Sequence, residues 1–200
     1  CQCFGTTVSN GNTGAQFLPG NTTCANETIS VTGCDGQSSL NYDGRTYDLV
    51  EIGGQCWFAE NLASTIYSNG DPIPTDLANS TWLNTTSGGF SIYGKLYNWY
   101  ACQDSRGICP SGWHVPSDCD WMFLESTLGI PIVDQEATGF RTTTEGTLLK
   151  SLDYWTFFEN DLNINSSGFS AIPAGFRIVD ATGGNQPYQE INGTGYWWTR

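Results

Sequence analysis

Eight cysteines constrain the fold of this 200-residue chain more than any other feature. Their number is even and no two are spaced as Cys-x-x-Cys, so disulfides formed in an oxidising compartment are favoured over a zinc or thioredoxin-like site. The sequence does not fix the pairing, but Cys102–Cys109 and Cys24–Cys34 are plausible short closures, each worth about 2–4 kcal/mol. We expect disulfides to involve Cys1, Cys3, Cys24, Cys34, Cys56, Cys102, Cys109 and Cys119.

The composition predicts a core rich in aromatic side chains. Charged residues make up 14% of the chain, whereas it contains 24 Gly, 8 Trp, 9 Tyr and 10 Phe. Each aromatic ring buries about 150–250 Å², and glycines supply turn conformations that other residues avoid. The composition therefore predicts a fold rich in β-structure and turns. Together with the hairpin and helix signals described below, the expected fold class is α+β: a loop-rich antiparallel sheet with about two short helices, stabilised by disulfides.

The net charge of −13, with only seven Lys and Arg, argues against binding to nucleic acid or anionic lipid. No segment approaches the about 20 apolar residues of a membrane span. The chain has neither an initiator Met nor a signal peptide, so we interpret it as the mature form of a secreted protein. Cys1 is then either a lipid-bearing cysteine or, as we favour with Cys3 so close, a disulfide partner.

Two hairpins are predicted early in the chain. Asp43-Gly44 is a two-residue turn signal between strand-like runs. The alternating segment 46–52 is the next strand, and Gly53-Gly54 turns it into a further strand over 55–59.

A helix over 117–128 is the clearest helical prediction. Ser117 is a good N-cap, Asp118 and Asp120 favour the positive end of the helix dipole, and Gly129 ends the helix. The apolar stripe that should face the core is Trp121, Leu124 and Leu128.

The other segments carry weaker signals. A second helix near 145–152 should bury Leu148, Leu149 and Leu152, and Thr75 is a candidate cap for a short helix through Trp82. Residues 91–102 fit a strand or an aromatic helix, and 169–198 fit strands separated by glycine turns. The composition divides the chain into a Cys-rich N-terminal segment, 1–40, and a domain, 41–200.

Several spaced motifs resemble one known family. The first is Ile52-Gly-Gly-Gln-Cys-Trp-Phe-Ala-Glu-Asn-Leu62, and the last is Gly195-Tyr-Trp-Trp-Thr199. The motifs between them are 93–100, 108–121, 146–151 and 166–177. Together they resemble the Fibrobacter succinogenes major paralogous domain over residues 41–200.

The resemblance implies a bacterial domain, secreted or on the cell surface, with a C-type lectin-like fold and no established catalytic residues. Family members usually continue beyond the Tyr-Trp-Trp motif, whereas this chain stops at Arg200. A sheet without its last strands would expose edges that pair with another chain. Residues 1–40 would then either fill a neighbour's gap or complete the sheet of their own subunit.

Catalytic and metal sites are weakly indicated. For His114, the only histidine, we favour a structural hydrogen bond over a role as catalytic base. Helix caps and surface positions are favoured over a two-carboxylate glycosidase site for Asp118, Asp120, Glu125, Asp153, Glu159 and Asp161. We therefore expect no enzyme activity.

No cofactor is predicted, and calcium is left open. Gln186-Pro187-Tyr188 matches the first two residues of a calcium-dependent lectin tripeptide. Tyrosine in the third position lacks the carbonyl or carboxylate oxygen that would bind calcium. Loop acids that remain candidates without a defined ligand set are Asp71, Asp76, Asp180 and Glu190.

Two kinds of glycan contact are considered. Six Asn-x-Ser/Thr sites, for which solvated loops are favoured over glycosylation, are Asn21, Asn26, Asn79, Asn84, Asn165 and Asn192. Candidates for stacking on sugars, each weighed against a place in the core, are Trp82, Trp155, Tyr188 and Trp198.

The function predicted first is an extracellular structural or adhesive surface protein, with self-assembly as a fibre subunit joined by strand complementation as its proposed mechanism. The alternative is a monomeric carbohydrate-binding module that uses the aromatic loops. Either partner, a second copy or a surface glycan, fits a secreted bacterial protein.

Overall fold

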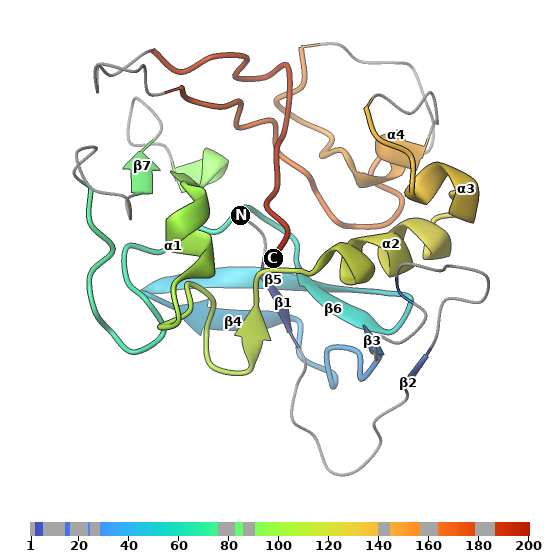
Figure 1. Ribbon diagram of the computed structural model, residues 1–200, viewed down its shortest axis with the longest axis horizontal. Coiled ribbons are helices and arrows are strands. Elements are labelled where there is room, and N and C mark those ends of the chain that lie inside the picture. The colour runs from blue at the N-terminus through green and yellow to red at the C-terminus, as the bar shows by residue number, and fades with distance from the viewer. Residues whose placement is uncertain are drawn as a thin grey trace.

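The computed structural model shows an α+β fold built on a five-stranded antiparallel sheet of order β4-β5-β6-β1-β9 (Figure 1). It describes residues 3–5, 15–16, 24, 29–75, 83–85, 91–139, 145–156, 164–178 and 187–200. This confirms the predicted disulfide-stabilised α+β class. None of the helices within these ranges has the length and apolar character needed to cross a membrane.

The regular elements are short. The strands of the main sheet are β1 (Phe4–Gly5), β4 (Ser39–Tyr42), β5 (Arg45–Ile52), β6 (Gln55–Phe58) and β9 (Trp113–His114). Two small sheets pair β2 (Ala15–Gln16) with β3 (Ile29–Ser30) and β7 (Leu83–Thr85) with β8 (Lys95–Tyr97). The helices are the 3-10 turn η1 (Ser91–Tyr93), α1 (Trp99–Gln103), α2 (Asp118–Thr127), α3 (Ile132–Gln135) and α4 (Glu145–Leu149).

Both predicted hairpins are confirmed. Asp43 and Gly44 have φ of 48° and 71°, the left-handed conformations that a tight turn between β4 and β5 requires. Gly53 and Gly54 connect β5 to β6, with Ile52 opposite Gln55. The resulting three strands form the long part of the sheet.

β6 carries the core on both of its faces. Trp57 meets Trp121 of α2 at 4.9 Å and Phe169 at 5.7 Å between ring centroids. Phe58 points the other way, against Tyr47 at 4.6 Å. Because successive residues of a strand face opposite sides, this Trp-Phe pair anchors two separate hydrophobic clusters.

Residues 1–40 contribute to their own sheet. β1 lies between β6 and β9, with Phe4 opposite both Trp57 and His114. Of the two roles predicted for residues 1–40, the position of β1 supports the one in which this segment completes the sheet of its own subunit. β2 and β3 are two residues each.

The disulfides differ from the short closures that the sequence suggested. The pairs are Cys3–Cys109, Cys24–Cys119 and Cys34–Cys56. Cys102–Cys109 and Cys24–Cys34 were wrong, because Cys3, which precedes β1, packs in one core cluster with Cys109, and Cys24 lies against α2. Cys102 is buried outside these three disulfides, and burial raises the pKa of its thiol to about 12. Cys1 is outside the described residues.

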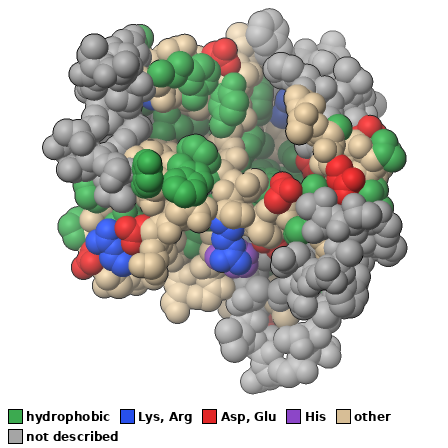
Figure 2. Space-filling model, in the orientation of Figure 1, with side chains coloured by type: hydrophobic (Ala, Val, Ile, Leu, Met, Phe, Trp, Pro, Cys, Tyr) green, Lys and Arg blue, Asp and Glu red, His purple; other side chains and the backbone are tan. Residues whose placement is uncertain are grey.

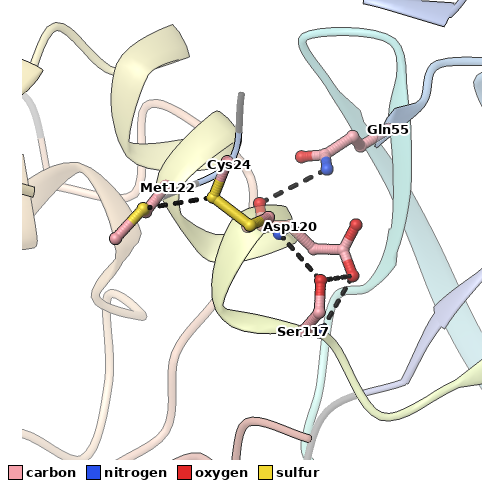
Figure 3. Close-up of a disulfide and its surroundings, with 6 residues drawn as sticks. Cys24, Gln55, Ser117, Asp120 and Met122 are labelled. Carbon is pink, nitrogen blue, oxygen red and sulfur yellow. Dashed lines mark hydrogen bonds between the residues drawn. A yellow bond between two sulfur atoms is a disulfide. The ribbon is translucent and has the colours of Figure 1, made fainter. Parts of the chain in front are cut away.

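α2 begins at a capping box that Figure 3 shows beside the Cys24–Cys119 disulfide. The backbone N–H of Asp120 donates to Ser117 Oγ at 3.2 Å, and the Ser117 N–H donates to Asp120 Oδ2 at 2.8 Å. Nε2 of His114 lies 3.2 Å from the same carboxylate oxygen. The predicted helix, its cap and the stripe through Leu124 are confirmed.

Other predictions need correction. α4 ends at Leu149, so Leu152, expected in the core, is 63% exposed. Instead of strands, the described residues of 169–198 form isolated bridges, Lys150 with Ala171 and Phe176 with Gln189. The described residues contain more than the two helices expected: besides α2 and the predicted α4, α1 and α3 are helices of five and four residues. The helix expected from Thr75 to Trp82 falls largely outside the described residues.

We predict that Asp120→Asn destabilises the protein more at neutral pH than in acid. Burial raises the pKa of the Asp120 carboxyl, but hydrogen bonds from His114 and Ser117 outweigh burial and hold the pKa below its usual value. A carboxyl with a lowered folded pKa stabilises the fold above about pH 4, and this stabilisation disappears as pH falls through the folded pKa. The substitution should lower the free energy of unfolding by about 1–2 kcal/mol at pH 7.

Urea unfolding at pH 7 and at pH 3 measures this difference. Asp118→Asn is the matched control, because Asp118 lies exposed in the same first turn. A loss of stability at pH 3 as large as at pH 7 would contradict the prediction.

Candidate functional site

A cavity of about 760 Å³ opens between α1, residues 175–177 and the C-terminal segment 196–198. It lies on the face drawn in Figure 2, where hydrophobic side chains gather around a hollow. Its size is within the usual range of small-molecule sites. The lining residues are Leu96, Tyr97, Asn98, Trp99, Tyr100, Gly175, Phe176, Arg177, Tyr196, Trp197 and Trp198.

Exposed aromatic rings concentrate at this cavity. Tyr196 is 59% exposed, Tyr100 54%, Trp99 49% and Trp198 38%. Single exposed hydrophobic residues are ordinary on protein surfaces, but a cluster around one hollow indicates a binding site. These four rings therefore define the candidate site.

α1 supplies one wall. The Asn98 side chain caps the helix by accepting a hydrogen bond from the Ala101 N–H at 2.9 Å. Ala101 and Cys102 face the core, so Trp99 and Tyr100 are left on the outer face, with ring centroids 5.3 Å apart. The short helix thus presents two aromatic rings to solvent.

The C-terminal segment supplies the opposite wall and is held by its indole groups. Trp198 Nε1 donates to the Tyr97 carbonyl at 2.8 Å, and Trp197 Nε1 donates to Asn61 Oδ1 at 3.1 Å. The Tyr196 ring lies 5.5 Å from the Phe176 ring. The edges of the two indoles are fixed to the protein, which orients their faces without a regular strand.

The Asn61 side chain joins the C-terminal segment to two other segments of the chain. Its Nδ2 donates to the carbonyls of Tyr93 at 3.1 Å and Ile172 at 3.2 Å, while its Oδ1 accepts from Trp197. The Asn61 side chain is nearly fully buried. Gly94 packs against it, and a Cβ at Gly94 would lie 2.6 Å from the Leu62 carbonyl oxygen. Two motifs far apart in sequence thereby meet.

Arg177 is the charged side chain of the described lining, which contains no carboxylate. Its Cζ lies 5.0 Å from the centroid of the Tyr188 ring. Reciprocal backbone hydrogen bonds between Phe176 and Gln189, at 3.0 and 2.9 Å, hold the preceding residue in place. The site therefore combines aromatic rings with one cation.

The predicted stacking residues lie in different environments. Trp198 lines the cavity and Tyr188 lies beside Arg177. Trp155 instead packs against the core, donating from Nε1 to the Ala171 carbonyl at 2.9 Å with Lys150 Nζ 5.0 Å from its ring centroid. Trp82 is outside the described residues.

The sequence reasoning missed the rings of Trp99, Tyr100 and Tyr196. The available signal was Asn98, a helix cap that precedes two aromatic residues and then Ala101. That order turns the aromatic pair away from the buried face of a helix. The hydrophobic period of residues 91–102 did not indicate a helix at α1, because η1, β8 and α1 follow one another within this short segment.

Several of the candidate catalytic and calcium residues have structural contacts, whereas Asp118 is exposed in the first turn of α2. His114 and Asp120 belong to the α2 cap. Asp71 accepts from Arg106 at 3.2 Å, and Glu190 accepts from Thr194 at 2.8 Å. The described ranges contain no group of three or more His, Cys, Asp or Glu arranged to hold a metal. Outside those ranges are Asp76, Glu159, Asp161, Asp180 and Gln186.

Two of the possible glycosylation sites make internal hydrogen bonds. Asn165 accepts from the Ser170 N–H at 2.8 Å and donates to Ser170 Oγ at 2.9 Å. Asn192 accepts from the Tyr93 hydroxyl at 2.6 Å. Asn84 belongs to β7, and Asn21, Asn26 and Asn79 lie outside the described residues. Glycosylation stays a prediction.

The three disulfides of the described residues are typical of secreted domains. Residues 50–200 match the Fibrobacter succinogenes major domain, and the chain belongs to this family. The family is bacterial and associated with the cell surface. No curated protein and no solved structure shows significant similarity to the chain.

We predict that Asn61→Ala lowers the free energy of unfolding by about 3 kcal/mol, because it leaves three partly buried polar groups without this partner. Urea unfolding followed by tryptophan fluorescence measures the change. Asn41→Ala, at an exposed position, is the control and should cost less than about 1 kcal/mol. Equal losses in both variants would show that Asn61 does not hold the walls together.

Proposed function

We propose that this domain is an extracellular adhesive module that binds glycans through the aromatic cavity. The observation that carries the proposal is the gathering of four exposed aromatic rings around one hollow. The faces of Trp and Tyr rings pack against apolar C–H surfaces, which every pyranose ring presents. Attachment to surface glycans would suit a member of a surface-associated family.

The chemistry of the lining supports a ligand that is both apolar and polar. Hydroxyls of Tyr100 and Tyr196, the amide of Asn98 and the guanidinium of Arg177 stand among the rings. Such groups offer hydrogen bonds to sugar hydroxyls at the edges of the stacked rings. Fixed indole edges also reduce the entropy lost on binding.

The proposed activity is binding without catalysis, and it needs no cofactor. A C-type lectin-like architecture remains part of this proposal, since it would place the binding loops at one end of the sheet. Display on the cell surface is likewise proposed from the family.

Self-assembly by strand exchange is a second candidate, favoured by the position of β1. This strand fills a slot between β6 and β9, which the same strand of another copy would fit. In an exchanged fibre, the bond between Cys3 and Cys109 would join two chains. The mass of the oxidised protein under denaturing conditions therefore separates the two arrangements.

For the unexchanged chain we predict a monomer mass in denaturing, non-reducing electrophoresis, with the pairs Cys3–Cys109, Cys24–Cys119 and Cys34–Cys56 in its peptide map. A reduced sample is the control for the migration of the monomer. A ladder of multimers that collapses on reduction would favour fibre assembly instead.

Glycan binding predicts that Trp99→Ala and Trp198→Ala each weaken affinity by about 10- to 100-fold, as expected for aromatic residues central to a binding site. A glycan array followed by calorimetry on the best ligand measures the loss. Tyr154→Ala is the matched control, because Tyr154 is 40% exposed but lies outside the cavity lining. An array without bound glycans, or equal losses in all three variants, would reject the proposal.

A further inference from the structure

The charge in the cavity lining contrasts with that of the whole chain. The protein carries 20 acidic and 7 basic residues, yet the described lining contains Arg177 and no acidic side chain. Acidic residues would repel an anionic ligand at contact, whereas a guanidinium beside aromatic rings attracts it. The lining is therefore suited to a ligand with a negative group.

We infer that the cavity takes a pyranose ring bearing an anionic group of the uronate type, whose carboxylate pairs with Arg177 while the aromatic rings stack on the sugar. This inference rests on the proposed glycan-binding function. The planar guanidinium fork donates two parallel N–H···O bonds to a carboxylate, a geometry that neutral sugar hydroxyls do not match. Arg177 would thus decide between charged and neutral saccharides of similar shape.

The surroundings of Arg177 support this role. Its guanidinium lies against the Tyr188 ring, 5.0 Å from the centroid. The preceding residue, Phe176, contacts Tyr196 of the C-terminal segment. The Arg177 side chain is partly buried, so water screens an ion pair there less than on the open surface.

The net charge of −13 does not oppose such binding. At physiological ionic strength, charges separated by more than about 8 Å are largely screened from one another. The affinity for an anionic sugar is then set by groups that touch it, and the lining supplies one cation. Selectivity for the anion should accordingly reside in Arg177.

The test is an array of matched pairs of saccharides, in which each uronate oligomer is printed beside its neutral methyl ester. Sulfated galactan oligomers and their unsulfated counterparts form a second set of pairs. We expect the wild-type chain to bind uronate members at least tenfold more tightly than their esters. Arg177→Gln should abolish this preference, and Arg177→Lys should keep part of it because the charge remains without the fork.

Arg200→Gln removes the same charge from an exposed residue outside the lining, and should leave the preference unchanged. Near-ultraviolet circular dichroism of each variant checks that the fold is retained. A preference for sulfated over unsulfated oligomers, lost in Arg177→Gln, would support pairing with an anion and assign it to sulfate.

Two results would overturn the inference, and they differ in what they leave standing. If esters and uronates bind equally and Trp99→Ala abolishes both, the glycan-binding function holds but Arg177 does not select an anion. If no saccharide binds, the proposed function fails and this inference fails with it.

Discussion

Asn61 shows how much of this structure depends on side chains that satisfy backbone groups. It bonds to Tyr93, Ile172 and Trp197, which come from three segments with little or no regular structure. Buried carbonyls and N–H groups need partners, and a segment without a strand ladder must find them elsewhere. The indoles of Trp155 and Trp198 serve the same need at Ala171 and Tyr97. Side-chain hydrogen bonds thus replace part of a sheet.

In the N-terminal segment, disulfides stabilise parts of the chain that make few hydrogen bonds in strands. Cys3–Cys109 and Cys24–Cys119 close loops of 106 and 95 residues, and each removes about 4–5 kcal/mol of chain entropy from the unfolded state in the loop-entropy model. Strands of two residues add few hydrogen bonds of their own. The N-terminal segment is therefore joined to the sheet by covalent bonds that its short strands only supplement.

Local chemistry made part of this fold predictable. The left-handed turn at Asp43-Gly44 and the Ser117 cap depend on neighbouring residues alone, so the hairpin and α2 follow from the sequence. Pairing of Cys3 with Cys109 depends on where β1 lies, which no local signal reveals. The described residues after Phe169 have strand-like composition, but they are held by backbone hydrogen bonds of turns and isolated bridges and by side-chain bonds, without a regular strand. This segment borders the cavity, and the sequence therefore did not predict the cavity, although Trp198 was among the predicted stacking residues.

The walls of the cavity explain why stability and binding are linked in this domain. Trp197 and Trp198 use their indole edges to hold the C-terminal segment, so the bonds that stabilise it also set the direction of the ring faces. On the other wall, burial of Ala101 and Cys102 turns Trp99 and Tyr100 outward. Neither wall can be moved without breaking contacts in the core. Ring positions fixed in this way lose little entropy on contact with a rigid ligand, which favours recognition by stacking over enclosure by a moving loop.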